Sequence, residues 1–260
     1  MRLRWYGRQV FASERRAAIL AIIFERGNAR TTDLAASLGV SEVTIRTDLE
    51  ILENHGRVAR VHGGATLPEA PIVGFDARAS QHVDAKQRIG AAAAKLVSDD
   101  MTIILDSGTT VFALARQLPT VSDLVVLTPG INIALALMEV SGIDVRLLGG
   151  RLVPRIAATV GSVRQQGLEG EIAHIAFLGA GGMDVDHDVV EGTFDIAEAK
   201  RSLAAAARKR VLLADSAKWF GTDRHKVMNV SGFDTVITDS AMPESVQDAI
   251  RAAGPSLIVA

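Results

Sequence analysis

Apolar residues recur with a helical period at the amino-terminal end of the chain. Ile19, Ile22 and Ile23 fall on one face of a helix that we expect to run from about residue 13 to Arg26. Gly27 follows directly and supplies a residue that can end a helix. The first predicted element is therefore an amphipathic helix whose apolar stripe packs on a small core.

A second, shorter helix and a third helix follow this first one. In the second helix, Leu34, Ala35 and Leu38 share one face. Gly39 then allows the positive φ that a tight turn needs. Ser41 can cap the start of the third helix, so the order predicted is helix, turn, helix.

The third helix has two contrasting sides. Ile45, Leu49 and Leu52 stand at i, i+4 and i+7, which directs them towards the core. The other side lies near the helix start, where recognition helices reach base edges in the major groove. Arg46 is the residue expected to contact a base, and Ser41 and Thr44 are expected to hold phosphate. The candidate DNA contacts on this helix are Ser41, Val43, Thr44, Arg46 and Thr47.

The stretch after the third helix resembles the wing of a winged helix-turn-helix. Residues 57–65 read as a basic strand that runs into a turn containing Gly63 and Gly64. Near that turn, Arg60 and His62 are expected to enter a minor groove or to clamp the DNA backbone. The competing interpretation is a three-helix structural domain whose charges are simply solvated.

A larger region with a different pattern follows. We divide the chain into a winged-helix domain at 1–66, a linker with two prolines and no clean period at 67–83, and a second domain at 84–260. In the second domain, short apolar runs alternate with helical stretches, which predicts a mostly parallel, doubly wound α/β sheet covered on both faces. The apolar runs lie at 102–105, 124–127, 143–148, 174–178, 211–214 and 235–237, and the helical stretches at 109–118, 131–140, 193–207 and 243–253.

Polar and glycine-rich segments follow the predicted strands, at the edge where sheets of this kind bind ligands. Residues 106–110, Asp-Ser-Gly-Thr-Thr, open a helix and combine hydroxyls with free backbone N–H groups, which suits an anion. A capped turn without any ligand explains the same residues equally well. A fixed acid, several glycines and one lysine can together hold a phosphate and sugar hydroxyls. The later segments are Thr128-Pro129-Gly130 with Asn132, Gly149-Gly150, Gly179 to Gly182 beside Asp184, and Asp215-Ser216-Ala217-Lys218.

Composition narrows the possible functions. The 260 residues contain no cysteine, which excludes thiol nucleophiles and thiolate metal sites, and the six histidines do not have metal-ligand spacing, so no metal or cofactor is expected. The apolar run at 17–24 is too short to span a bilayer, and we expect a cytoplasmic protein. His174, inside an apolar run, is expected to be a core histidine. Net charge is −2, made of +3 in residues 1–65 (ten arginines against seven acids) and therefore −5 in the remainder, which supports DNA binding weakly.

The motifs resemble those of a known family. Residues 41–65, SEVTIRTDLEILENHGRVARVHGGA, are similar to the signature of DeoR-type bacterial transcriptional regulators: V-S-x-x-T-I-R-R-D-L, then L-E-x-x-G, then R-x-H-G-G-A. Thr47 stands where that family usually has a second arginine. The second domain resembles the family's effector domain, whose fold is similar to ribose-5-phosphate isomerase. It departs at Pro129, where asparagine is usual, and at Gly181, where aspartate is usual. The resemblance implies effector contacts at Asp106, Ser107, Gly108, Thr109, Thr110, Gly149, Gly150, Gly179, Lys200 and Lys218.

The sequence therefore predicts a DNA-binding transcriptional regulator and not an enzyme. The expected function is a repressor of a carbohydrate-catabolism operon, controlled by a phosphorylated sugar. Its partners would be double-stranded operator DNA, the sugar phosphate and further copies of itself, as a homodimer or homotetramer, with no membrane partner.

Two alternatives remain open. One is a sugar-phosphate isomerase with a DNA-binding appendage, in which Asp106 or Asp184 would act as base and Lys218 as electrophile. Gly181 argues against it, because the loop after the fourth strand then lacks a carboxylate. The other alternative is a second domain that serves assembly alone and binds no ligand.

Overall fold

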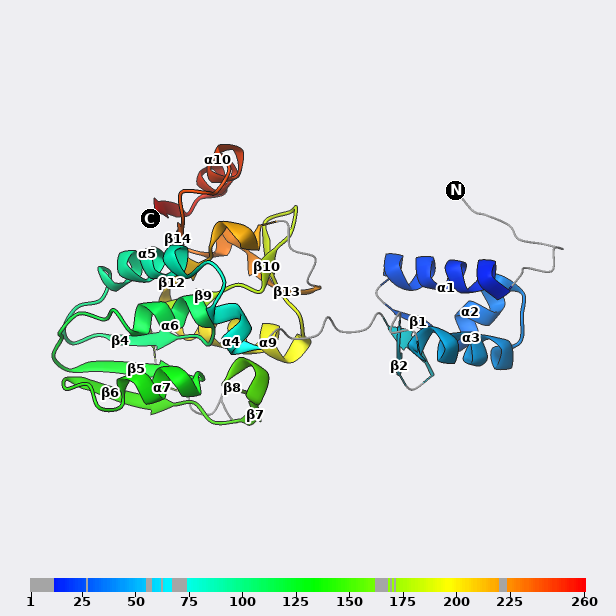
Figure 1. The fold of residues 1–260 in the computed structure, drawn as a ribbon, viewed down its shortest axis with the longest axis horizontal. Helices are drawn as coiled ribbons and strands as arrows, with labels where there is room; N and C mark the ends of the chain where they lie inside the picture. Colours follow the sequence, from blue (N-terminus) through cyan, green and yellow to red (C-terminus); the bar gives the residue numbers. More distant parts are fainter. Residues whose placement is uncertain are drawn as a thin grey trace. The chain divides into compact units, whose positions relative to one another are not determined.

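The computed structural model describes residues 12–26, 28–54, 58–61, 63–66, 74–161, 168, 170, 172–219 and 224–260. Packing of the chain divides it into two compact units, Met1–Ala70 and Pro71–Ala260 (Figure 1). None of the helices in the described part of the chain combines the length and the apolar character that a membrane crossing requires.

The first unit contains the helix-turn-helix and the wing that the sequence predicts. Its three strands form an antiparallel sheet in the order β1-β3-β2. β2 and β3 are the wing, and Gly63 adopts a positive φ of 80° in the turn between them. The elements are α1 (Ala12–Arg26), β1 (Asn28–Arg30), α2 (Thr31–Leu38), α3 (Glu42–Asn54), β2 (Ala59–Val61) and β3 (Gly64–Thr66).

One apolar cluster holds the three helices of this unit together. Ile19 and Ile23 of α1 pack with Ile45 and Leu49 of α3, and all four side chains are buried. Gly39 ends α2 in the left-handed conformation, with φ 67°, which a residue with a Cβ rarely adopts. The predicted inward side of α3 is thereby confirmed.

The second unit is built on a seven-stranded parallel sheet, which confirms the predicted α/β class. The strand order is β15-β14-β12-β9-β4-β5-β6, and every neighbouring pair is parallel. The six predicted apolar runs correspond to six of these strands, and the seventh strand lies at the carboxyl end of the chain. The strands are β4 (Thr102–Leu105), β5 (Leu124–Thr128), β6 (Ile143–Leu147), β9 (Ala173–Gly179), β12 (Ala207–Leu213), β14 (Thr235–Thr238) and β15 (Ser256–Val259).

Helices cover both faces of this sheet. Ile103 and Phe177 belong to the apolar cluster under α5, α6 and α7, whereas Ile104 and Leu178 belong to the cluster under α9 and α10. Successive residues of a strand point to opposite faces, so the two clusters share the same strands. α6 and α7 each end three residues before the predicted end. The helices are α5 (Val83–Ala94), α6 (Thr109–Ala115), α7 (Ile131–Leu137), α9 (Phe194–Ala205) and α10 (Glu244–Ala253).

Several short elements were not expected from the sequence, because they contain too few residues to show a period. The segment predicted as a linker, 67–83, contains the helix α4 (Phe75–Ala79). A hairpin, a three-stranded antiparallel sheet in the order β10-β11-β13, and single 3₁₀ turns are the others. They are β7 (Arg151–Val153), β8 (Ala158–Val160), β10 (Gly182–Met183), β11 (Asp188–Glu191), β13 (His225–Asn229), η1 (Pro154–Ile156), η2 (Ser216–Lys218) and η3 (Val230–Gly232).

His174 is not a core residue, contrary to the prediction. Its side chain is exposed, and its Nδ1 accepts a hydrogen bond from the Thr102 N–H at 3.0 Å. The residue is the second of β9, at the rim of the sheet, and an apolar run does not reveal where the rim lies.

The order of the strands creates a site at the centre of the sheet. The chain runs from β4 through β5 to β6 at one edge, and then returns to place β9 on the other side of β4. The carboxyl ends of β4 and β9 therefore form a topological switch point, where open α/β sheets bind ligands. Ser107–Thr110 and Gly179–Ala180 leave the sheet at this point.

Candidate functional site

The predicted DNA-contacting side of α3 is open to solvent within the described part of its unit. Val43 is 68% exposed, and the side chain of Arg46 is 64% exposed. Arg46 lies 3.2 Å from Glu42, a pair one helical turn apart that contributes little at a surface. Ser41 caps the helix as predicted, because its Oγ accepts the Thr44 N–H at 3.2 Å.

One buried acid in α3 was missed by the sequence reasoning. Asp48 is 2% exposed, and its carboxylate lies 2.5 Å from Arg15 and 3.4 Å from Arg16, both on α1. Two of the arginines that made the segment basic therefore hold α1 to α3. The signal was available, because Asp48 falls on the same helix side as Ile45 and Leu49.

The wing carries Arg60 as predicted, but this residue is tied to α3. Its backbone N–H donates to Glu53 Oε1 at 3.0 Å, and its guanidinium lies 3.8 Å from the same carboxylate. Both side chains are exposed, so the ion pair is weak and leaves Arg60 able to exchange partners. His62, the second predicted wing contact, lies outside the described residues.

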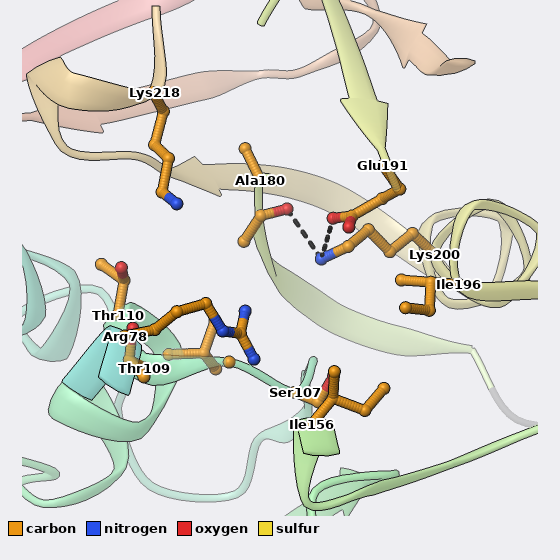
Figure 2. Close-up of a pocket in the computed structure, with 13 residues that line it drawn as sticks. Arg78, Ser107, Thr109, Thr110, Ile156, Ala180, Glu191, Ile196, Lys200 and Lys218 are labelled. Atoms are coloured by element: carbon orange, nitrogen blue, oxygen red, sulfur yellow. Dashed lines mark hydrogen bonds and ion pairs between the residues drawn. The ribbon is translucent and has the colours of Figure 1, made fainter. Parts of the chain in front are cut away.

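A pocket lies at the switch point between β4 and β9 of the second unit (Figure 2). It collects side chains from α4, from the loop after β4, from β11 and α9, and from η2. The space in it that the centre of a water molecule can occupy is about 30 Å³. The residues that line it are Arg78, Ser107, Gly108, Thr109, Thr110, Val111, Ile156, Gly179, Ala180, Glu191, Ile196, Lys200 and Lys218.

A buried charge cluster forms one wall of this pocket. Lys200 donates to Asp106 and to the Gly179 carbonyl at 2.9 Å, and lies 3.2 Å from Glu191. Asp106 also accepts the Gly179 N–H at 3.1 Å, which ties the end of β4 to the end of β9. Burial alone would lower the pKa of Lys200, but the two carboxylates outweigh it and raise that pKa. Lys200 and Asp106, both predicted effector contacts, therefore satisfy each other.

Two other cations point into the same cavity from opposite walls (Figure 2). Within the described residues, Nε and one terminal nitrogen of Arg78 are buried and make no hydrogen bond. Burial lowers the pKa of Arg78, against the attraction of Glu191 and Asp106. Lys218 has no carboxylate within ion-pair distance in the part of the chain that the structure describes. These two groups lie beside the Ser107 and Thr109 side chains, and together they can bind an anion.

Arg78 was missed because it belongs to the segment predicted as a linker. Its helix is held by Lys86 of α5, which is buried and whose Nζ donates to the carbonyls of Arg78 and Gln81 at 2.5 and 2.6 Å. Burial lowers the pKa of Lys86. The attraction of Asp215 raises this pKa by a smaller amount, and the repulsion of Lys218 and Arg78 lowers it further. Lys86 thus fixes the end of α4 from which Arg78 reaches the pocket.

Other residues singled out in the sequence are placed elsewhere. Gly149 and Gly150 do not line the pocket, and a Cβ on Gly150 would lie 2.5 Å from the Val160 carbonyl, so this glycine allows close packing on β8. Asp184 accepts backbone N–H groups of its own turn, and Asp215 caps η2. Among the described residues, no group of three or more metal-ligating side chains is present.

Comparison with known proteins assigns both regions of the chain to one family. Residues 15–70 match the model of the DeoR-like helix-turn-helix domain, and residues 81–240 match that of the DeoR C-terminal sensor domain. The HTH-type transcriptional repressor GlcR of Bacillus subtilis (strain 168) is 31% identical over 252 residues, which is 96% of this chain and 97% of its own. The glycerol-3-phosphate regulon repressor of Escherichia coli (strain K12) is 28% identical over 239 residues, 92% of this chain and 95% of its own.

Among solved structures, ribose 5-phosphate isomerase A from Methanocaldococcus jannaschii aligns with 54% of this chain and 55% of its own. The TM-score is 0.39 and the sequence identity 20%.

Proposed function

Because the chain belongs to the DeoR family of helix-turn-helix transcriptional regulators, we propose that it is a repressor that releases its operator when a phosphorylated sugar binds. In this proposal residues 1–66 bind double-stranded operator DNA and residues 84–260 bind the effector. The DNA contacts are Ser41, Val43, Thr44, Arg46 and Thr47 of the recognition helix, with Arg60 and His62 of the wing.

The presence of two uncommitted cations in one pocket supports a phosphorylated effector. In this cavity Lys200 forms ion pairs with both Asp106 and Glu191, whereas Arg78 and Lys218 form no ion pair among the described residues, so a dianionic phosphate would give both cations a partner. The hydroxyls of Ser107, Thr109 and Thr110 supply further donors. A relative named for glycerol-3-phosphate agrees with a phosphate ester as the class of ligand. Lys200, Asp106 and Gly179 would form the wall that shapes this site.

We infer that effector binding changes the position of Arg78. The pocket offers about 30 Å³ to the centre of a water molecule, which is small for a sugar phosphate, so we expect a lining side chain to move when the effector binds. Arg78 belongs to α4, the first described element of the second unit along the chain. A ligand that favours another position of α4 would have the differential affinity that a switch requires.

The proposed regulator acts in the cytoplasm as a homodimer or homotetramer. One winged-helix unit buries little DNA surface, and two copies can read paired half-sites. A repressor must reach its operator, so the proposed protein acts in the compartment that holds the chromosome.

The proposed function does not include catalysis. An isomerase of this kind needs a base held at the reacting carbon, and the candidates in the sequence are carboxylates. Asp106 and Glu191, the carboxylates at the pocket, are both paired with Lys200, Asp184 holds its own turn outside the pocket, and Gly181 has no side chain. Incubation with ribose 5-phosphate and glucose 6-phosphate should yield no ketose phosphate, and turnover of either substrate would overturn this part.

The direct test is a mobility-shift assay on DNA upstream of the protein's own gene. The protein alone should retard this DNA at low salt, and one of a panel of sugar phosphates should release it. Failure of the protein alone to retard the DNA would refute operator binding. Retardation unchanged by every member of the panel would refute the phosphorylated effector.

Arg46→Ala should weaken specific operator binding by about 1–3 kcal/mol, the scale of one bidentate base contact. The control is Arg251→Ala, which removes another exposed helical arginine paired with an acid of its own helix, in the second unit. Competition between operator and unrelated DNA measures the effect. If Arg46→Ala prefers operator over unrelated DNA as strongly as the unchanged protein does, α3 enters the groove in another register.

A further inference from the structure

The strand β6 offers an unpaired edge of the parallel sheet. It is the last strand in the order, and within the described residues no strand pairs with its outer side. Figure 1 shows β6 beyond β5, with α7 beside it. An edge of this kind is a template for another strand, and natural proteins cover or disrupt it unless it is used.

The backbone groups that point outwards from β6 can be identified from its ladder. Gly142 O accepts the Leu124 N–H at 3.0 Å, and the Leu148 N–H donates to Thr128 O at 2.8 Å. In a parallel ladder, alternate residues of a strand bond to the same neighbour. The even-numbered residues of β6 therefore bond to β5, and Val145 and Leu147 direct their N–H and C=O groups to the free edge.

The side chains of β6 are self-complementary about Val145. Asp144 and Arg146 flank it, are both exposed, and form an ion pair at 2.9 Å along the strand. Ile143 and Leu147 stand two residues before and after Val145, on the opposite face of the strand. A strand with this pattern matches a reversed copy of itself, acid to base and apolar to apolar.

We propose that β6 pairs antiparallel with β6 of a second copy, about a two-fold axis through Val145. In this register the two Val145 residues exchange N–H···O=C bonds. Asp144 then lies opposite Arg146 of the second copy in the neighbouring pair without backbone bonds, where side chains approach most closely. Two seven-stranded sheets would join into one continuous sheet.

The exposed apolar residues of the same edge support a second copy as the occupant. Leu135 of α7 and Met138, which caps the end of this helix, are 65% and 62% exposed and lie one helical turn apart, and Leu147 of β6 is 50% exposed. α7 packs with β6 on the face that holds Ile143 and Val145. A two-fold axis perpendicular to the sheet keeps that face on the same side in both copies, so the two α7 helices would flank the joint.

The opposite edge of the sheet lacks this pattern. β15 reads Ser-Leu-Ile-Val at 256–259 and has no charged side chain, so it has no acid–base register to choose a partner or a direction. This acid–base pattern therefore distinguishes β6 from the other edge strand of the same sheet.

Charge reversal on the full-length chain, without DNA or effector, tests the interface. Asp144→Arg places two arginines opposite each other, and Arg146→Asp places two aspartates opposite each other. Each variant should halve the mass measured by light scattering. If β6 forms the only interface, the starting mass is about 55 kDa, that of two chains of 27.6 kDa. The double variant Asp144→Arg/Arg146→Asp restores opposite charges and should restore the mass. Retention of the parental mass by both single variants would overturn the proposal, as would failure of the double variant to recover it.

Two further variants separate pairing from general effects. Val145→Pro removes an outward N–H and no bond to β5, so it should also halve the mass while circular dichroism stays that of the folded protein. Asp248→Arg, which breaks an exposed pair on α10, should leave the mass unchanged. A parental mass for Val145→Pro would exclude β6 pairing, even if the mobility-shift assay shows operator binding. If instead the unchanged protein has the expected dimer mass but does not bind the operator, the repressor function is contradicted and β6 pairing is not.

Discussion

Replacement of Lys200 by methionine is expected to lower the free energy of unfolding of the second unit by about 3–5 kcal/mol. The lysine is 4% exposed, and it forms ion pairs with Asp106 and Glu191, both of which are buried. Methionine keeps the length of the side chain but leaves two buried carboxylates without their ion-pair partner, and the attraction of Arg78, which forms no ion pair with either, does not replace it. Chemical denaturation, followed by circular dichroism, measures the loss.

The matched control is Lys226→Met. Lys226 also forms an ion pair, at 2.6 Å from Asp188, but its side chain is 58% exposed, so its removal should cost no more than about 1 kcal/mol. Neutralising the acids in the triple variant Asp106→Asn/Glu191→Gln/Lys200→Met should recover part of the stability. Equal losses for Lys200→Met and Lys226→Met would show that burial of the charge cluster does not determine its contribution.

The contribution of Lys200 should not vary with pH through the neutral and mildly alkaline range. Its pKa is raised in the folded protein above the ordinary lysine value of 10.5, because the attraction of Asp106 and Glu191 exceeds the effect of burial. A raised pKa gives stability that is complete below the unfolded value and is lost only as the pH rises through the folded one.

The recognition helix could be predicted because its information is local. Positions 45, 49 and 52 set the buried side of α3, and the period of 3.6 residues then places Val43 and Arg46 outside. The role of Asp48 depends on α1, more than thirty residues earlier in the chain, and a helical period does not show which arginines reach it.

The pocket could be predicted only in part. The loop after β4 was found because a strand, a glycine and hydroxyls follow one another in the sequence. That Lys200 satisfies Asp106 and Glu191 depends on three segments meeting, which no spacing reveals. Gly150 was expected to contact ligand, but glycine serves equally to admit a neighbouring backbone, here that of Val160.

Arg78 shows the opposite error, a functional candidate in a segment without a recognisable pattern. α4 has only five residues, fewer than two helical turns, so its apolar and polar positions define no period. Its position depends on Lys86, whose buried Nζ binds two carbonyls at the end of the helix. A sequence pattern reveals a helix when the helix buries a stripe of apolar side chains, and α4 has no buried residue.

Replacement of Arg78 by alanine is expected to raise the concentration of sugar phosphate that releases the operator by roughly thirtyfold or more. Removal of one partner of a buried charge pair costs about 2–5 kcal/mol, and each 1.4 kcal/mol is a factor of ten. The guanidinium has buried nitrogens without a hydrogen-bond partner among the described residues, so the phosphate would supply what it lacks. Titration of the operator complex with glucose 6-phosphate, ribose 5-phosphate and glycerol 3-phosphate measures the release.

Two comparisons make this result specific. Arg78→Lys keeps the charge and loses the planar fork, so its release concentration should fall between those of the alanine variant and the unchanged protein. Arg116→Ala removes an exposed arginine just after α6, outside the pocket, and should release the operator at the original concentration. Because Arg78 lies in the second unit, operator affinity without effector should be the same in all three variants. Release of the Arg78→Ala complex at the original concentration would mean that the phosphate binds elsewhere, and that the guanidinium in this pocket serves only to balance Asp106 and Glu191.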